Sequence, residues 1–442
     1  MRVRFVGHAS IAIECQNQVI LCDPWLVGKV FNNSWALLSP PSPPAFSTVD
    51  YIWISHEHPD HLSFPSLKSI PDSDKSQIKV LYQRHASPRV VDSILKLGFS
   101  HVIELPQYRW FRLGRDLEIF CGSVWLMDSF LAVRDRVSKE CVLNLNDCVL
   151  NIDQLRYIKR RIGDVSLLFT QFSFAQWVGN DRDEDHGAER KIEQLTHQIE
   201  IFKPAFTVPT ASFVYFCNQE NCRMNPWMNT PDSIARLKLK GVNFMYPGDE
   251  WDSDTRSFED MRARERYRAD YANLKIDPTP DPVDISQISQ AVEKRLQEIK
   301  SKVPKLSLKR LPPFAIYIHD LEKVLEVDPA RGNYRIFEGN AQQRQAARYV
   351  MCSQVAWFTF AFPWGLNTAL SSGMFRDRQF AKKGWKNGWN PFFKWQIRLS
   401  TEVFRFGNIG ESFRTINFWW RKKGEKFFQY TGTLRGHGVA DE

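Results

Sequence analysis

The chain has 442 residues and a formal net charge of +9, with 43% hydrophobic and 25% charged residues. These proportions describe an ordinary globular protein, and the length favours two domains over a single small core. No apolar run is long enough to span a bilayer, and the N-terminus has no signal-peptide core, so the sequence predicts a cytoplasmic protein.

The eight cysteines are scattered, and none forms a Cys-x-x-Cys pair. We therefore predict neither a zinc ribbon nor an iron–sulfur ligand set, and expect most of them to be buried thiols. The positive charge is compatible with an anionic ligand, but a solvated basic surface is the interpretation that we prefer. No nucleic-acid partner is predicted.

Strands and helices alternate along the first 210 residues. Residues 2–14 and 18–22 predict the two strands of a hairpin with its turn near Gln16 and Asn17. Further strands are expected over 51–54, 78–82, 101–105, 117–120, 130–133, 142–146, 165–171 and 206–208, and helices over 64–70, 88–97, 152–162 and 189–202. This alternation predicts an α/β architecture with mixed sheets.

The strongest signal is the stretch from Tyr51 to His61. An apolar, β-branched run ends at Ser55, and His56, His58, Asp60 and His61 follow on the loop that leaves the strand. Imidazole and carboxylate are ligands that suit zinc, iron and manganese, and their close spacing lets them converge on one ion. A polar loop with incidental histidines is the alternative, but four ligand-type side chains at a strand end favour a metal site.

The later part of the chain changes in composition. A turn-rich segment at 277–282 precedes an amphipathic helix with an apolar stripe from Ile285 to Ile299. Strands are expected over 314–318 and 334–337, and a helix over 341–360. Segments 385–395 and 418–423 interleave aromatic residues with lysine or arginine, which most simply predicts element edges with the aromatics inward. We predict domains at 1–270 and 312–442, joined by a linker and helix at 271–311.

Four segments of the chain resemble a known family. The pattern His56-Glu57-His58-Pro59-Asp60-His61 is similar to the His-x-His-x-Asp-His motif of the metallo-β-lactamase superfamily, and Gly7–Ser10, Asp23–Trp25 and Asn146–Cys148 resemble other segments of it. Residues 61–68, 145–148, 189–191 and 203–213 look most like the branch of the CMP-N-acetylneuraminate hydroxylases, here without their Rieske domain.

The resemblance implies a four-layer αβ/βα sandwich with a smaller α+β C-terminal domain. It also implies a site for one or two divalent ions, zinc or iron, with manganese as a further option. Carried over to this chain, His56 and His58 hold one ion, Asp60 and His61 hold a second, and Asp147 bridges them.

Two histidines of the superfamily have no counterpart. One would lie in the region of Cys121–Trp125 and the other near Thr210–Ser212. Asp128 is the predicted oxygen ligand in place of the first, and His85 and His186 are alternatives. His8 is a weaker candidate for supporting a ligand through a hydrogen bond, because ordinary packing of a strand histidine is the simpler expectation.

The sequence supports three functional hypotheses. The first is a metal-dependent hydrolase of esters, phosphodiesters or lactones, in which Asp60 orients the attacking water or accepts its proton. The second is an iron-dependent oxygenase, which needs an external reductase or ferredoxin. The third is a catalytically silent binding protein. Hydrolysis is ranked first because it requires nothing that the chain lacks, and the expected partner is a small molecule, with an anionic group as one option.

Overall fold

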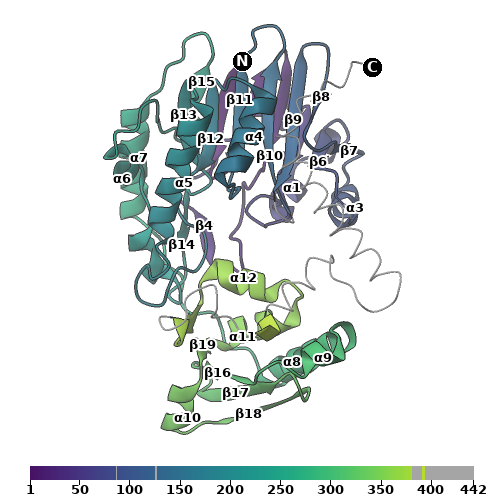
Figure 1. Ribbon diagram of the computed structural model, residues 1–442, viewed down its shortest axis with the longest axis vertical. Helices are drawn as coiled ribbons and strands as arrows, with labels where there is room; N and C mark the ends of the chain where they lie inside the picture. Colours follow the sequence, from purple (N-terminus) through teal and green to yellow (C-terminus); the bar gives the residue numbers. More distant parts are fainter. Residues whose placement is uncertain (86, 125–126, 381–390, 394–442) are drawn as a thin grey trace. The chain divides into compact units, whose positions relative to one another are not determined.

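The computed structural model describes residues 1–85, 87–124, 127–380 and 391–393 (Figure 1). The chain divides into two compact units. The first holds Met1–Pro280 together with Thr368–Arg376, and the second holds Asp281–Asn367 and the described residues from Asp377 onward. No helix in these ranges is both long and apolar enough to cross a membrane.

Two large sheets form the first unit. Within the described residues, a seven-stranded sheet has the order β15 (Glu250–Asp252), β1 (Arg2–Gly7), β2 (Ser10–Cys15), β3 (Gln18–Cys22), β5 (Tyr51–Ile54), β6 (Lys79–Gln83) and β7 (His101–Leu105). A six-stranded sheet has the order β13 (Phe206–Thr210), β12 (Leu167–Gln171), β11 (Cys141–Asn146), β10 (Asp128–Asp135), β9 (Leu117–Val124) and β8 (Arg109–Arg112).

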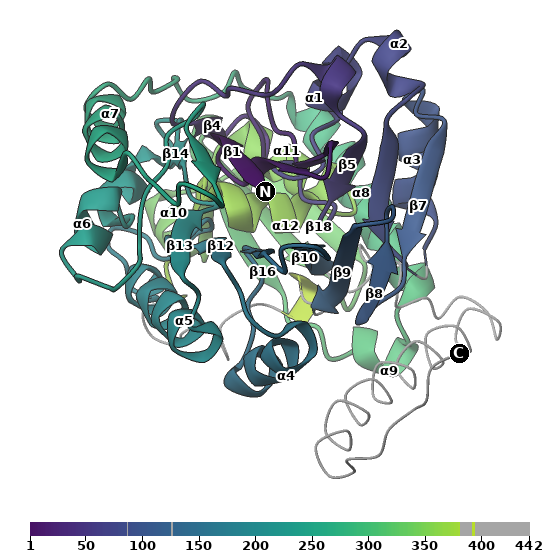
Figure 2. The ribbon, with the colours of Figure 1, turned by 90° about the horizontal axis from the view of Figure 1, so that it is seen from above.

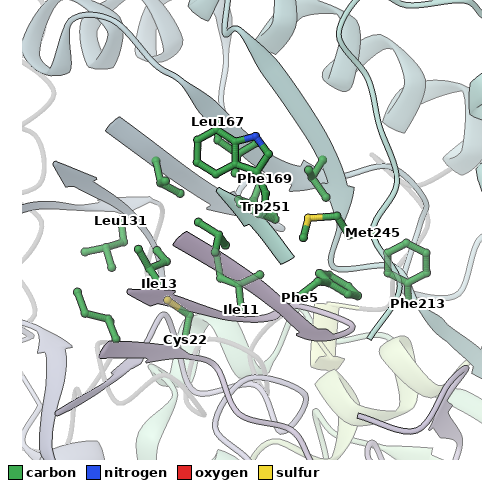
Figure 3. Packing of buried hydrophobic residues seen from close by; sticks show 14 of the residues in the cluster. Phe5, Ile11, Ile13, Cys22, Leu131, Leu167, Phe169, Phe213, Met245 and Trp251 are labelled. Carbon is green, nitrogen blue, oxygen red and sulfur yellow. The ribbon is translucent and has the colours of Figure 1, made fainter. Parts of the chain in front are cut away.

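The main core of this unit lies between the two sheets. Side chains such as Ile11 and Ile13 of β2 and Leu131 of β10 are fully buried there (Figure 3). In β12, Leu167 belongs to this inner core, whereas Leu168 belongs to a second core on the opposite face. Because successive side chains of a strand point to opposite faces, a sheet covered on both sides needs the continuous apolar runs that these strands have.

Helices cover the outer face of each sheet. The helices α1 (Phe64–Ser69) and α3 (Arg89–Lys96) bury Leu67 and Ile94 against the first sheet. The helix α4 (Ile152–Ile162) buries Leu155 and Ile158 against the second, beside α5 (Gly187–Phe202). Figure 2 shows the two pairs on opposite sides of the strands. The first unit is therefore the expected four-layer αβ/βα sandwich.

The predicted boundaries of α4 are correct, and its ends explain why. The side chain of Asn151 accepts a hydrogen bond from the backbone of Gln154, and the side chain of Gln154 bonds back to Asn151, which forms a capping box. Gly163 follows the last turn with a φ of 74°, a value that glycine adopts at little cost.

The prediction of one strand over residues 2–14 is wrong. The structure has two antiparallel strands, β1 and β2, joined by a tight turn at His8 and Ala9. Gly7 has a φ of 150° and His8 a φ of 45°, so the chain reverses here although the apolar pattern continues on both sides. The second turn, at Gln16 and Asn17, lies where it was expected and joins β2 to β3.

Several smaller elements of the first unit were not predicted. They are the strands β8 and β15, the β4–β14 pair (Trp35–Leu37 with Val214–Phe216), the helices α2 (Asp72–Lys75), α6 (Pro231–Ala235) and α7 (Asp260–Ala272), and two 3-10 helices at Phe46–Thr48 and Cys222–Trp227. The late segment Thr368–Arg376 also packs here: the indole of Trp35 donates to the carbonyl of Ser371 at 3.0 Å, and Asn221 donates to that of Ser372 at 2.7 Å.

The second unit combines helices with a mostly antiparallel sheet. It holds α8 (Ile285–Lys302), α9 (Lys305–Leu308), β16 (Phe314–Ile318), β17 (Lys323–Asp328), β18 (Asn333–Glu338), α10 (Ala341–Ala346), β19 (Tyr349–Met351) and α11 (Ser353–Ala361). The described strands β18, β17, β16 and β19 lie in that order. The helix α12 (Gly365–Ser372) and the strand β20 (Phe375–Asp377) include the points where the chain passes between the units.

The single helix predicted over residues 341–360 is also wrong. It is interrupted by β19, which pairs in parallel with β16, so that Tyr349 lies opposite Ile316. The aromatic pattern of this segment does not distinguish a buried strand from a buried helix. Residues 349–351 form a strand because they pair with the edge of β16. Of the two aromatic–basic segments, only residues 391–393 lie within the described part of the chain, and segment 418–423 lies outside it.

Candidate metal centre

The candidate ligands converge where several strand ends meet. The strands β3 and β5 pair in parallel and end at Cys22 and Ile54, while β11 ends at Asn146 in the other sheet. The first residue of β10, Asp128, lies at the same edge because β10 runs antiparallel to β11. Loops that leave these ends carry Asp23, the His56–His61 segment and Asp147.

The metal-binding motif forms a compact cluster of donor atoms. His56 Nε2 lies 2.8 Å from His58 Nδ1, and His61 Nε2 lies 3.3 Å from Asp60 Oδ2. Asp147 Oδ2 lies 3.7 Å from the Nε2 atoms of both His56 and His61. The carboxylate that the resemblance implies as a bridge is thus placed between the two halves of the motif.

Asp23 holds one of these histidines in position. Its Oδ2 accepts a hydrogen bond from His61 Nδ1 at 2.9 Å, and its Oδ1 accepts one from the backbone of Ser55 at 2.7 Å. Asn146 also donates to Asp23. Because Nδ1 of His61 donates to Asp23, Nε2 is the atom that faces Asp60 and Asp147, and it can bind an ion that displaces its proton. Asp23 was not among the predicted site residues, although its place at the end of a predicted strand was a signal for it.

Asp128 lies in the region that lacks the superfamily's third histidine. It is opposite Val124 in the β9–β10 pair, and together with His56 and His58 it forms a group whose donor atoms lie within 4.8 Å of one another. The structure therefore brings Asp128 to the position for which the sequence proposed it.

His8 lies in the site, contrary to the expectation of ordinary strand packing. It belongs to the β1–β2 turn, and its Nε2 donates to Asp60 Oδ2 at 3.3 Å. The carbonyl of His8 accepts hydrogen bonds from Thr210 Oγ1 at 2.7 Å and from the backbone of Ala211 at 2.9 Å. The segment that lacks the superfamily's last histidine thus fixes His8, which forms a donor group with Asp60 and His61.

The two other candidate histidines lie outside these donor groups. His186 precedes α5 with a side chain that is 70% exposed, and it pairs with Glu189 at 3.3 Å. His85 accepts a hydrogen bond from the backbone of Ser87 at 3.2 Å. Neither belongs to a cluster of three possible metal donors among the described residues.

The electrostatics of the site favour a cation. Burial lowers the pKa values of His8, His56 and His58, which keeps these side chains neutral and able to bind an ion. Burial together with the charge of Asp147 raises the pKa of Asp128 to about 7. Burial opposes charge on both Asp60 and His61, but their attraction prevails, so the pKa of Asp60 is lowered well below its usual value and that of His61 is raised well above it.

Unsatisfied polar atoms test whether these residues suit a metal ion. Asp60 Oδ1, His61 Nε2 and Asp147 Oδ1 are buried without a hydrogen-bond partner in the described part of the chain. Leaving such groups unpaired costs about 1–3 kcal/mol each, and more when they are charged. Their nitrogen and oxygen donors are those that zinc and iron prefer, so the residues fit a divalent ion.

Comparisons with known proteins agree with this geometry. The model of the β-lactamase superfamily domain matches residues 2–112, which include the whole His56–His61 segment. Residues 2–112 of the chain are therefore similar to the metallo-β-lactamase superfamily. Divalent metals are the cofactors of this superfamily, most of whose members are enzymes.

The curated relatives of this chain are longer proteins. The chain is 30% identical over 256 residues to a putative Rieske 2Fe-2S iron-sulfur protein of Mycolicibacterium smegmatis, covering 53% of this chain and 48% of that protein. It is 36% identical over 158 residues to the cytidine monophosphate-N-acetylneuraminic acid hydroxylase of Xenopus laevis, covering 34% of this chain and 26% of that protein. The chain thus spans about half the length of the first of these relatives, or less.

Among solved structures, a possible metal-dependent hydrolase from Veillonella parvula DSM 2008 is similar. It has a TM-score of 0.43 and 15% sequence identity, and the match covers 57% of this chain and 98% of that one.

Asp23→Asn is expected to weaken metal binding by about 10–100-fold, because it removes the charge that orients His61 and increases its basicity. Titration against a chromophoric chelator measures the affinity. Asp50→Asn is the matched control, since the exposed Asp50 accepts a backbone hydrogen bond from Val19 at 2.8 Å, near the start of β5. Equal affinities of the two variants would refute the role of Asp23.

Proposed function

We propose that the protein is an iron-dependent oxygenase that hydroxylates a small molecule with electrons from a separate donor. The observation that carries this proposal is the composition of the donor groups. Each of the three groups, His8–Asp60–His61, His56–His61–Asp147 and His56–His58–Asp128, contains two histidines and one carboxylate. Two histidines and one carboxylate with open positions are the donor set of non-haem iron oxygenases.

The names of two curated relatives also support an oxygenase. One is named as a hydroxylase, and another as a putative Rieske iron-sulfur protein. In a hydroxylation, one atom of dioxygen enters a C–H bond and the other leaves as water, which consumes two electrons and two protons. An external reductase or ferredoxin supplies the electrons in this proposal.

The side chains of this chain have defined tasks in the proposed reaction. His56, His58 and Asp128 would hold one ion, His61, Asp60 and His8 a second, and Asp147 both. A bound iron ion supplies the one-electron chemistry that dioxygen requires. Asp23 fixes the orientation of His61, and the hydrogen bond from His8 to Asp60 fixes that carboxylate. This rigid support keeps the donor atoms within reach of an ion throughout the reaction.

Metal-dependent hydrolysis is the second candidate, and it was ranked first on sequence alone. The observation that favours it is the placement of Asp147 Oδ2 at 3.7 Å from both His56 and His61, which suits a pair of ions that activates water. Asp128 takes the place of an imidazole in the His56–His58–Asp128 group. This shifts our preference to iron, because two histidines and one carboxylate with open positions are the donor set of non-haem iron oxygenases.

Metal analysis combined with oxygen uptake tests the proposal. Protein prepared without chelator and without air is expected to contain iron and to consume oxygen when a reductant and a mediator are added. Zinc alone, with hydrolysis of a chromogenic phosphodiester or lactone and no oxygen uptake, would reject the oxygenase and favour the hydrolase. Less than about a tenth of an equivalent of any metal would reject both enzymes.

The variant Asp128→His sharpens this test, because it restores a set of three imidazoles. Iron bound relative to zinc is expected to fall several-fold when the two metals compete, and reductant-dependent oxygen uptake is expected to fall with it. Asp153→His is the control, since Asp153 lies in the first turn of α4 with a side chain that is 71% exposed.

A further inference from the structure

Lys191 on α5 is a partly buried cation without an acidic partner. Its Nζ donates to Gln171 Oε1 and, at 3.4 Å, to Gln194 Oε1. Both acceptors are neutral amides, and no carboxylate in the described ranges lies within 4.0 Å of this ammonium group. An ammonium group that is removed from water normally requires a negative partner, so this arrangement is unusual.

The two glutamines connect Lys191 to the loops of the metal centre. Gln194 donates to the carbonyl of Cys148 at 3.0 Å, and Cys148 follows the bridging residue Asp147. Gln171, at the end of β12, donates to the carbonyl of Ala211 at 3.1 Å, and the backbone of Ala211 donates to that of His8. Lys191 is therefore held between the loop that carries Asp147 and the segment that supports His8.

The charge of Lys191 acts on the metal ligands without direct contact. Burial lowers the pKa of Lys191 to about 8, against the opposing effects of Asp147 and Asp128. In turn, Lys191 is among the cations that lower the pKa of Asp128. The ammonium group and the carboxylates of the centre thus influence each other's pKa, although no ion pair joins them in the described part of the chain.

Metal ions bound at the centre would raise the free-energy cost of burying the Lys191 ammonium group. Four carboxylates, Asp23, Asp60, Asp128 and Asp147, balance the charge of two divalent ions, so none of them is left to offset Lys191. An uncompensated charge is unfavourable where water is excluded. A ligand that carries a negative group would compensate it.

We propose that Lys191 binds an anionic oxygen group of the substrate, a carboxylate or a phosphate, beside the metal centre. The inference rests on the metal centre of the proposed function but not on the reaction assigned to it. Lysine acts on such groups as a compact point charge, and its unused N–H group can donate to an anionic oxygen. The two glutamines position the ammonium group and neutralise none of its charge.

Anion binding to the zinc-loaded protein tests this role without any turnover. Inorganic phosphate and acetate are titrated calorimetrically into the wild type, Lys191→Met, Lys191→Arg and Lys96→Met. Lys96 is the matched control, because it is an exposed lysine at the end of α3. Lys191→Met is expected to weaken binding at least about tenfold, Lys191→Arg much less, and Lys96→Met not at all. A larger loss of phosphate affinity in Lys191→Met identifies the substrate group as a phosphate, and a larger loss of acetate affinity identifies it as a carboxylate.

Two results would overturn the proposal. One is binding by Lys191→Met within about twofold of the wild type at equal zinc content. The other is loss of zinc or of folding in both Lys191→Met and Lys191→Gln, which would make Lys191 a structural link between the glutamines. Failure of the oxygenase assay leaves these binding measurements unaffected, so the two proposals are refuted separately.

Discussion

Asp147→Ala is expected to lose both metal ions and at least about a hundredfold of any metal-dependent activity. Asp147 Oδ2 lies 3.7 Å from the Nε2 atoms of both His56 and His61, so its removal opens both halves of the centre. Two divalent ions would then repel each other with one carboxylate fewer to offset their charge. Metal content per chain, measured after gel filtration, checks this expectation.

His58→Ala and Asp153→Ala complete the comparison. His58 belongs only to the group with His56 and Asp128, so its loss is expected to remove about one ion and to leave the other. Asp153 is an exposed carboxylate, and its loss is expected to leave the metal content unchanged. If Asp147→Ala retained as much metal as His58→Ala, a bridging role for Asp147 would be untenable.

Leu131→Ala is expected to destabilise the first unit by about 2–5 kcal/mol. Leu131 lies in β10, near the middle of the second sheet, and its fully buried side chain faces the core between the two sheets (Figure 3). Truncation removes apolar area from this core and leaves a cavity that strands paired on both sides cannot close. Denaturant unfolding followed by circular dichroism measures the change.

The matched control is Leu237→Ala in the same unit. The side chain of Leu237 is 42% exposed, and its loss is expected to cost less than about 0.5 kcal/mol. Similar destabilisation by the two substitutions would contradict the assignment of the inter-sheet layer as the main core. Because the chain has two units, the transition of the first must be resolved from that of the second.

Local signals in the sequence predicted much of the fold. The apolar run of β5, the capping residues of α4 and the apolar stripe of α8 each lie within one continuous segment, and the elements were found close to their observed bounds. The errors came where an apolar pattern continues across a change in structure. The turn at His8 and the strand β19 are both of this kind. Positive φ angles at Gly7 and His8 reverse the chain at the first, and pairing with β16 decides the second.

The sequence by itself determined that the four candidate donors between His56 and His61 lie close together, because residues only a few positions apart remain close in any fold. Their role as ligands stays a prediction. Asp147 and Asp128 required the resemblance to a family, and their role as ligands stays a prediction that the metal analyses test. Only the tertiary structure placed His8 against Asp60, Asp23 against His61 and Lys191 against Gln171. These pairs join segments far apart in the sequence. Which strand ends share an edge depends on the order and direction of strand pairing, and no local pattern specifies these.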